Sequence, residues 1–249
     1  MPYDIRPCTL ADVARLCAMY HGYSGAGTVA VCCQGVYETQ PLAWWRIQRT
    51  AWRRVFHRAR LVAAFAWQPP PPGAAKAACS EVPGGVLALS RMVAVPKDER
   101  TLRHISKPLR IIMRRLIDRT RWPVLITYSD ESLGHLGHVY KCSGWQPERD
   151  AEGNLVRRSS TSYENAAGQR ISSYSAGKSR AATLVRIGDK VTLRWAHWVS
   201  PTPLAFMVDH GWEQVPIPGK VWRSGKQAHT WVNLYAQWWD SALEREEAA

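Results

Sequence analysis

The chain has 249 residues, 46% hydrophobic and 21% charged, so it can bury a sizeable core and is not intrinsically disordered. No apolar run approaches the roughly 18 residues of a membrane-spanning helix, and the N-terminus lacks a targeting pattern. We therefore expect a soluble protein of the cytoplasm. Its net charge of +13 favours a polyanionic partner, with nucleic acid ahead of an anionic membrane.

The cysteine pattern argues against two further classes of protein. The six cysteines include no C-x-x-C pair, which makes a four-ligand zinc site improbable. Without a secretion signal, a disulfide-stabilised fold is not expected either. We expect reduced, mostly buried thiols.

In the first third of the chain, short apolar segments flank a basic block. Thr9 is a good N-cap, and the apolar spacing over residues 9–20 predicts a short amphipathic helix. Strands are predicted over 29–37 and 61–67. The block 44–60 carries six arginines and no acidic residue. It is either a solvated helix face or a surface that contacts the phosphates of DNA, and we favour DNA because unpaired arginines repel one another.

The next segment has the order of a parallel sheet. A proline-rich loop is predicted from 68 to about 85, followed by a β-rich stretch at 86–95. A helix with one apolar face is expected from Ser106, and a buried strand over 124–128. A strand, loop, helix, strand order implies a parallel or mixed sheet with a helix packed on it.

The remainder of the chain has weaker patterns. Residues 149–182 are rich in Arg, Ser and Gly and predict a long loop or extended arm. Residues 183–195 resemble a hairpin that turns at Gly188, and 229–235 are predicted to form another strand. The acidic tail is expected to fray.

Residues 127–145 (TYSDESLGHLGHVYKCSGW) hold most of the reactive groups. Asp130 follows a predicted strand, and the carboxyl end of a strand in an open sheet is a common ligand site. His135 and His138 are three residues apart and would share a helix face. Together with Tyr140 these groups suit acid–base chemistry or metal binding, although Asp130 as a helix cap with exposed histidines is an equally simple interpretation.

Two overlapping family resemblances rest on these motifs. VAVPKDER before a helix, and YKCSGW, resemble marks of the GNAT N-acetyltransferase superfamily. LSRMVAV, HGYSG and above all TYSDESLGHLGHVYKCSGW are similar to the Mom family, over roughly residues 15–147. Mom proteins are phage DNA-modification enzymes that convert adenine to N6-(carbamoylmethyl)adenine and so protect phage DNA from restriction.

The resemblance implies an α+β fold, a GNAT-like mixed sheet flanked by helices with a basic, β-containing C-terminal extension. Residues 1–148 would form the catalytic core, and 149–249 a basic Ser/Arg-rich arm and extension. It implies a transferase acting on adenine N6 of double-stranded DNA in the cytoplasm of the bacterial host, with acetyl-CoA or a related acyl donor and no membrane partner. The rivals are an ordinary acetyl-CoA-dependent N-acetyltransferase and a non-catalytic DNA-binding protein.

The resemblance and the residue patterns together give three sets of candidate residues. The catalytic set is Tyr140, as the acid that protonates a departing thiolate, with Asp130 and Arg91. The donor would be bound by residues that hold an anion by charge, because the loop after residue 95 has no glycine: Arg100, Arg103, His104 and Ser106. DNA would be contacted by the arginines Arg46, Arg49, Arg53, Arg54, Arg157 and Arg158.

The reaction also raises the prospect of a metal. The family's product joins nitrogen to a methylene carbon, which attack on a carbonyl does not give. A redox metal such as iron, held by His21, His135 and His138 with Asp130, would offer one-electron chemistry. A different small-molecule donor is the alternative.

Overall fold

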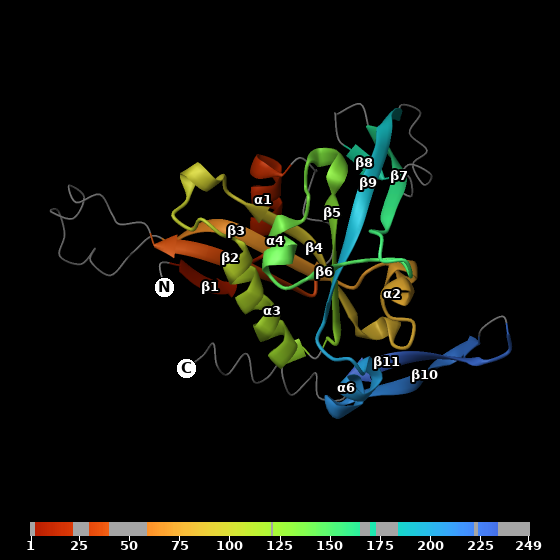
Figure 1. Ribbon diagram of the computed structural model, residues 1–249. Helices are drawn as coiled ribbons and strands as arrows, with labels where there is room; N and C mark the ends of the chain where they lie inside the picture. Colours follow the sequence, from red (N-terminus) through yellow and green to blue (C-terminus); the bar gives the residue numbers. More distant parts are fainter. Residues whose placement is uncertain are drawn as a thin grey trace, which may run out of the picture.

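The computed structural model describes residues 3–21, 30–39, 59–120, 122–164, 170–172, 184–221 and 224–233. Figure 1 shows one large sheet with helices on both sides and a small two-stranded sheet beside it. Among the described residues, no helix is both long and apolar enough to cross a lipid bilayer.

Nine strands form the large sheet. In chain order they are β1 (Tyr3–Pro7), β2 (Cys32–Thr39), β3 (Ala59–Gln68), β4 (Val86–Ala94), β5 (Val124–Asp130), β6 (Gln146–Pro147), β7 (Arg157–Glu164), β8 (Arg170–Ser172) and β9 (Val185–Trp198). Their order across the sheet is β1-β2-β3-β4-β5-β9-β7-β8, and β6 pairs with β9. Among the described strands of this sheet, only the β4–β5 pair is parallel, and the other pairs are antiparallel. The predicted α+β class, a mixed sheet flanked by helices, is confirmed.

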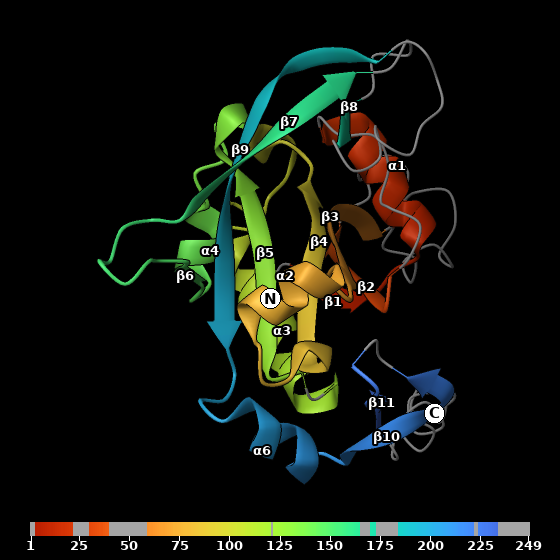
Figure 2. The ribbon, with the colours of Figure 1, turned by 90° about the vertical axis from the view of Figure 1, so that its right-hand side faces the viewer.

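Four helices accompany the large sheet. They are α1 (Leu10–Tyr20), α2 (Pro72–Ala78), α3 (Ser106–Thr120) and α4 (His138–Cys142), and α1 and α4 lie on opposite sides of the sheet (Figure 2). As predicted, Thr9 is the N-cap of α1, and it forms a capping box with Asp12.

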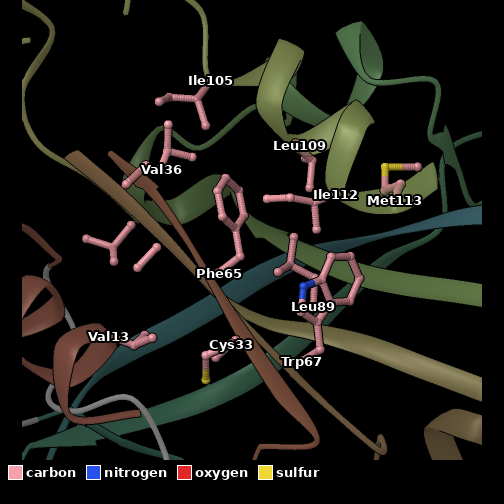
Figure 3. Packing of buried hydrophobic residues seen from close by; sticks show 14 of the residues in the cluster. Val13, Cys33, Val36, Phe65, Trp67, Leu89, Ile105, Leu109, Ile112 and Met113 are labelled. Atoms are coloured by element: carbon pink, nitrogen blue, oxygen red, sulfur yellow. The ribbon is translucent and has the colours of Figure 1, made fainter. Parts of the chain in front are cut away.

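The main core lies where α3 packs on β2, β3 and β4. Figure 3 shows Phe65 of β3 pointing toward Leu109 and Ile112 of α3, while Val13 of α1 lies beyond the strand on the other side. All four side chains are fully buried. Burial of apolar side chains on both faces of β3 fixes the sheet between two helical layers.

Beside the sheet, α6 (Pro203–Asp209) leads into the antiparallel pair β10 (Trp212–Val221) and β11 (Gln227–Asn233). A second, smaller core joins this part to the sheet, since Met207 of α6 packs with Val86 and Val124. The predicted strand near 229–235 is therefore present as β11, and the acidic tail lies outside the described residues.

The strands β4 and β5 separate toward their carboxyl ends. They pair only from Val86–Ala88 to Val124–Ile126. Beyond that point β4 continues beside β3, and β5 continues beside β9. Figure 2 shows the two strands diverging. The fork opens a space at the edge of the sheet where the candidate residues were expected.

Three sequence predictions are corrected. The proline-rich loop contains α2, because Pro72 at the first helical position starts a helix instead of preventing one. The expected hairpin over 183–195 is the single strand β9, in which Gly188 lies at a bulge and not at a turn. Part of the expected arm is β7, so the sheet runs across the predicted boundary at residue 148.

Candidate active site

A cavity of about 1260 Å³ occupies the fork between β4 and β5. Its walls come from β4, β5, the segment leading into α4, the end of α1, and the strands β7 and β9. The residues with reactive or polar side chains that line it include His21, Ser90, Arg91, Thr127, Tyr128, Ser129, Asp130, His135, His138, Tyr140, Lys190 and Thr192. The three predicted catalytic residues, Arg91, Asp130 and Tyr140, therefore line one cavity.

Asp130 is the last residue of β5, and its side chain is only 6% exposed. Its Oδ1 accepts hydrogen bonds from the backbone N–H of Ser132, at 3.2 Å, and from the Ser132 hydroxyl. Its Oδ2 lies 3.4 Å from the Nζ of Lys190 on β9. The carboxylate is thus both a cap of the turn that follows and one half of an ion pair in the cavity wall. Sequence reasoning missed Lys190.

The segment after Asp130 reaches α4 through two left-handed glycines. Gly134 has φ +74° and Gly137 has φ +72°. A Cβ at Gly137 would lie 2.1 Å from the ring of Trp195, whose indole N–H donates to the hydroxyl of Ser129 at 2.9 Å. The chain therefore needs glycine at 137 for both its conformation and its contact with the indole.

Tyr140 lies on α4 with its ring packed between Trp145 and Trp195. Burial raises the pKa of Tyr140, and a hydrogen bond between its hydroxyl and that of Thr127 offsets part of the rise. The Thr127 hydroxyl oxygen also lies 3.1 Å from the Leu89 carbonyl oxygen, which helps to hold the threonine side chain in place. A tyrosine held protonated at the cavity wall is suited to giving a proton to a leaving group.

Arg91 approaches the cavity from β4, next to a bulge. On the neighbouring strand β3, Ala66 pairs with Arg91 and the next residue, Trp67, pairs with Leu89. Ser90 is therefore the extra, unpaired residue of the bulge in β4. The Ser90 hydroxyl donates to the carbonyl of Ala66 at 3.0 Å, and the guanidinium of Arg91 donates to the carbonyl of Ser90 at 2.7 Å. The bulge explains how a charged side chain in an apolar strand reaches the cavity.

The histidines do not form the predicted metal centre. His21 and His135 have ring centroids 6.5 Å apart, whereas His138 begins α4 and shares no helix face with His135. Burial, followed by the charges of Arg91, His135 and Lys190, lowers the pKa of His21, so its ring is neutral at neutral pH. Within the described part of the chain, no three His, Cys, Asp or Glu side chains come together as a metal site. Because Asp130 is bonded to Ser132 and faces Lys190, the expected ligand set is not assembled.

The loop between β4 and α3 does not fit the pyrophosphate of coenzyme A. The buried carboxylate of Glu38 accepts the N–H groups of Thr101, at 3.0 Å, and Leu102. Burial alone would raise the pKa of Glu38, but these N–H bonds lower it. Arg100 donates to two carbonyls of its own loop, those of Val95 and Leu102. Arg100 is therefore a structural residue of the loop.

The other predicted donor-binding residues lie around the same loop. Arg103 and His104 are exposed. Ser106 begins α3, and its carbonyl accepts a hydrogen bond from the Ser143 hydroxyl at 3.2 Å. None of the four predicted residues lines the cavity.

The predicted DNA-contacting arginines divide into two groups. Arg46, Arg49, Arg53 and Arg54 lie outside the described residues. Arg157 and Arg158 begin β7, and each pairs with a carboxylate: Arg157 with Glu131 at 2.7 Å, and Arg158 with Glu148. Glu148 also pairs with the buried Arg194 of β9. Hydrogen bonding to Glu148 raises the pKa of Arg158, so these two arginines belong to an ordered strand instead of an open arm.

Comparison with known proteins yields a family and several solved structures. No curated protein sequence matches the chain. Solved structures that resemble it include the ribosomal-protein-S18-alanine N-acetyltransferase of Escherichia coli, at 11% identity and a TM-score of 0.40, covering 80% of this chain and 94% of that one. Another is NAA60 of Arabidopsis thaliana in complex with a bisubstrate analogue, at 10% identity and a TM-score of 0.41, covering 79% and 97%.

The sequence profile of the Mom protein family matches residues 5–191, well over half of the chain. The match includes β4, β5, the glycine segment and α4, which together carry Arg91, Asp130 and Tyr140. This protein therefore belongs to the Mom protein family.

Proposed function

We propose that this protein is a transferase that modifies the N6 atom of adenine in double-stranded DNA, giving N6-(carbamoylmethyl)adenine and so protecting phage DNA from restriction in the bacterial cytoplasm. The observation that carries the proposal is the meeting of Arg91, Asp130 and Tyr140 in one cavity of about 1260 Å³, in a chain of the Mom protein family. Pockets that bury small ligands commonly have volumes of ~300–1,000 Å³, so this one has room for a base and a donor group together.

The proposed product dictates the bond changes. A bond forms between adenine N6 and the methylene carbon of the transferred group, the bond from that carbon to its leaving group breaks, and N6 loses one proton. This is a displacement at the methylene carbon and not attack on a carbonyl. The protein must accept a proton near N6 and supply one near the leaving group.

The cavity holds suitable groups for both proton transfers. Asp130 presents a buried carboxylate beside Lys190, and in the proposed reaction it accepts the N6 proton. Tyr140, protonated because burial raises its pKa, gives a proton to the leaving group. Arg91 lines the same cavity and orients the polar end of the transferred group by hydrogen bonding. Exchange with solvent then restores Asp130 and Tyr140.

The substrate must enter the cavity as an extruded base. Adenine N6 is hydrogen-bonded to thymine inside the duplex, and unstacking the nucleotide costs a few kcal/mol. The net charge of +13 supports binding to the DNA backbone, which would offset this cost. Arg46, Arg49, Arg53 and Arg54 remain the proposed contacts.

The test is nucleoside mass spectrometry of DNA from cells that express the protein. The expected result is a carbamoylmethylated deoxyadenosine that is absent from cells expressing the Asp130→Asn variant. An N6-acetylated deoxyadenosine would instead support the ordinary acetyl-CoA reaction. Unmodified DNA, with protection from restriction retained in the Asp130→Asn variant, would identify a non-catalytic DNA-binding protein.

A further inference from the structure

The β4–α3 loop contains an anion that belongs to the protein itself. Glu38 lies near the end of β2, 63 and 64 residues from the two N–H groups that its carboxylate accepts. Glu38 is only 5% exposed to solvent. A carboxylate bound by two adjacent backbone N–H groups occupies the kind of position in which such a loop otherwise binds a phosphate.

Further donors of the loop and of the helix that follows it are also engaged. The guanidinium of Arg100 is bonded to the carbonyls of Val95 and Leu102. At the start of α3, the N–H of Lys107 donates to the His104 carbonyl and that of Leu109 to the Ile105 carbonyl. Pro108 has no N–H. Three of the first backbone positions of this helix, Lys107, Pro108 and Leu109, therefore offer no free N–H to an anion.

Side chains also restrict the approach of a ligand to this loop. Glycine is absent from 93–132. Leu102 and Ile105 are each 6% exposed and belong to the main hydrophobic core. A pyrophosphate held by this backbone would have to displace Glu38 and expose these apolar side chains to its own charge, which is unfavourable.

We infer that Glu38 permanently closes the β4–α3 loop to phosphate, so that the donor is recognised through the transferred group and the arm that enters the cavity, without a nucleotide pyrophosphate bound at this loop. This inference deepens the proposed function by restricting the class of donor, and it rests on that function only for the identity of the reaction. The closure of the loop follows from the contacts of Glu38 alone.

The first experiment compares two probes that share a thiol arm. Coenzyme A carries a pyrophosphate and a nucleotide, and pantetheine carries neither. Isothermal titration of the full-length protein should give coenzyme A an advantage of no more than about fivefold, the effect of exposed cations, or no binding of either probe. A loop that makes two N–H bonds to a phosphate would favour coenzyme A by roughly 100-fold or more. That advantage, abolished by competing inorganic pyrophosphate, would overturn the inference.

The second experiment opens the loop. Glu38→Ala uncovers two N–H groups, and inorganic pyrophosphate should then raise the melting temperature of the variant but not that of the wild type. Glu99→Ala is the matched control, because Glu99 lies at the same loop, 47% exposed, and pairs with Arg60; it should gain no stabilisation. A folded Glu38→Ala protein that gains none either would show that Glu38 does not close the loop.

The two experiments are independent of the proposed reaction. Neither contains DNA, and the titration of the wild type stands even if Glu38→Ala fails to fold. A failure of the closed-loop inference therefore appears as selective binding of coenzyme A. A failure of the proposed function appears as unmodified DNA in the nucleoside assay.

Discussion

The two segments that follow the parallel strands β4 and β5 start from neighbouring positions in the sheet and differ completely in character. The segment after β4 is closed: Glu38 accepts its N–H groups, and Leu102 and Ile105 are buried in the core. The segment after β5 is open: it starts with Asp130, turns at two left-handed glycines, and lines the cavity.

The contrast shows how one sheet edge can carry a site on only one of its strands. A loop that is bonded to a neighbouring strand and packed into the core is fixed, and the N–H groups that hold the strand's carboxylate are not available to a ligand. A loop built on glycine turns brings its backbone close to the cavity and leaves room for a ligand. The chemistry should therefore depend on the segment after β5, whereas the segment after β4 should contribute stability. Four predictions test this division.

The largest effect is expected at the two proton-transfer residues of the open segment. Asp130→Asn and Tyr140→Phe should each lower the rate of adenine modification by ~10²–10⁴-fold, the usual cost of losing a positioned acid or base. The rate is measured by nucleoside mass spectrometry of duplex DNA treated with purified protein. Asp209→Asn and Tyr163→Phe, which change residues away from the cavity, are the matched controls. Near-normal rates in both cavity variants would place the chemistry elsewhere.

The next effect separates the two glycines of the open segment. In Gly134→Ala the added Cβ would have no heavy atom within 4 Å. The variant should therefore lose only the roughly 1–2 kcal/mol of unfolding free energy that a left-handed alanine costs. Gly137→Ala has the same strain and also places Cβ 2.1 Å from Trp195, which adds about 1–3 kcal/mol of overpacking. Urea unfolding measures both free energies. Equal losses of unfolding free energy in the two variants would show that the Trp195 indole moves aside at no cost in free energy.

The closed segment should be sensitive to acid. The N–H bonds to Glu38 hold its pKa in the folded protein below its ordinary value of 4.5. Its contribution is therefore present above that pH and is lost as the pH falls through the folded pKa. At neutral pH, Glu38→Ala should cost on the order of 3 kcal/mol, because two buried N–H groups lose their acceptor. The difference between wild type and variant, followed by urea unfolding, should shrink as the pH falls below the ordinary pKa of a glutamate. A difference that is independent of pH would contradict the N–H bonds.

The smallest effect concerns the residue that positions Tyr140. Thr127→Val removes the hydroxyl bonded to Tyr140 while keeping the volume, and should lower kcat by roughly 3–10-fold with little change in KM for DNA. The alkaline limb of the pH profile should move to higher pH, because the bond to Thr127 lowers the pKa of Tyr140. Thr127→Ser, which keeps the hydroxyl, should restore both. A uniform loss of rate with an unmoved pH profile would indicate a packing role alone.

Local patterns predicted much of the fold. Thr9 and the apolar spacing after it gave α1, and the β4, α3, β5 order gave the parallel pair. The predictions failed where a local signal had two meanings. The prolines that usually end an element begin α2, and Gly188 marks a bulge in β9 where a turn was expected. In both cases the neighbouring strands decide the outcome, and a single sequence does not contain that information.

The sequence by itself determined which residues could do chemistry. Asp130 at a strand end, Tyr140 in its motif and Arg91 in an apolar strand were all visible as residue types at fixed spacings, and so was the family. Only the tertiary structure decided what each of them faces. Lys190 contacts Asp130 from a position 60 residues later in the chain. Glu38 accepts N–H groups that lie 63 and 64 residues after it. Such pairings arise from strand order and register, which burial of the whole core fixes, so no local pattern encodes them.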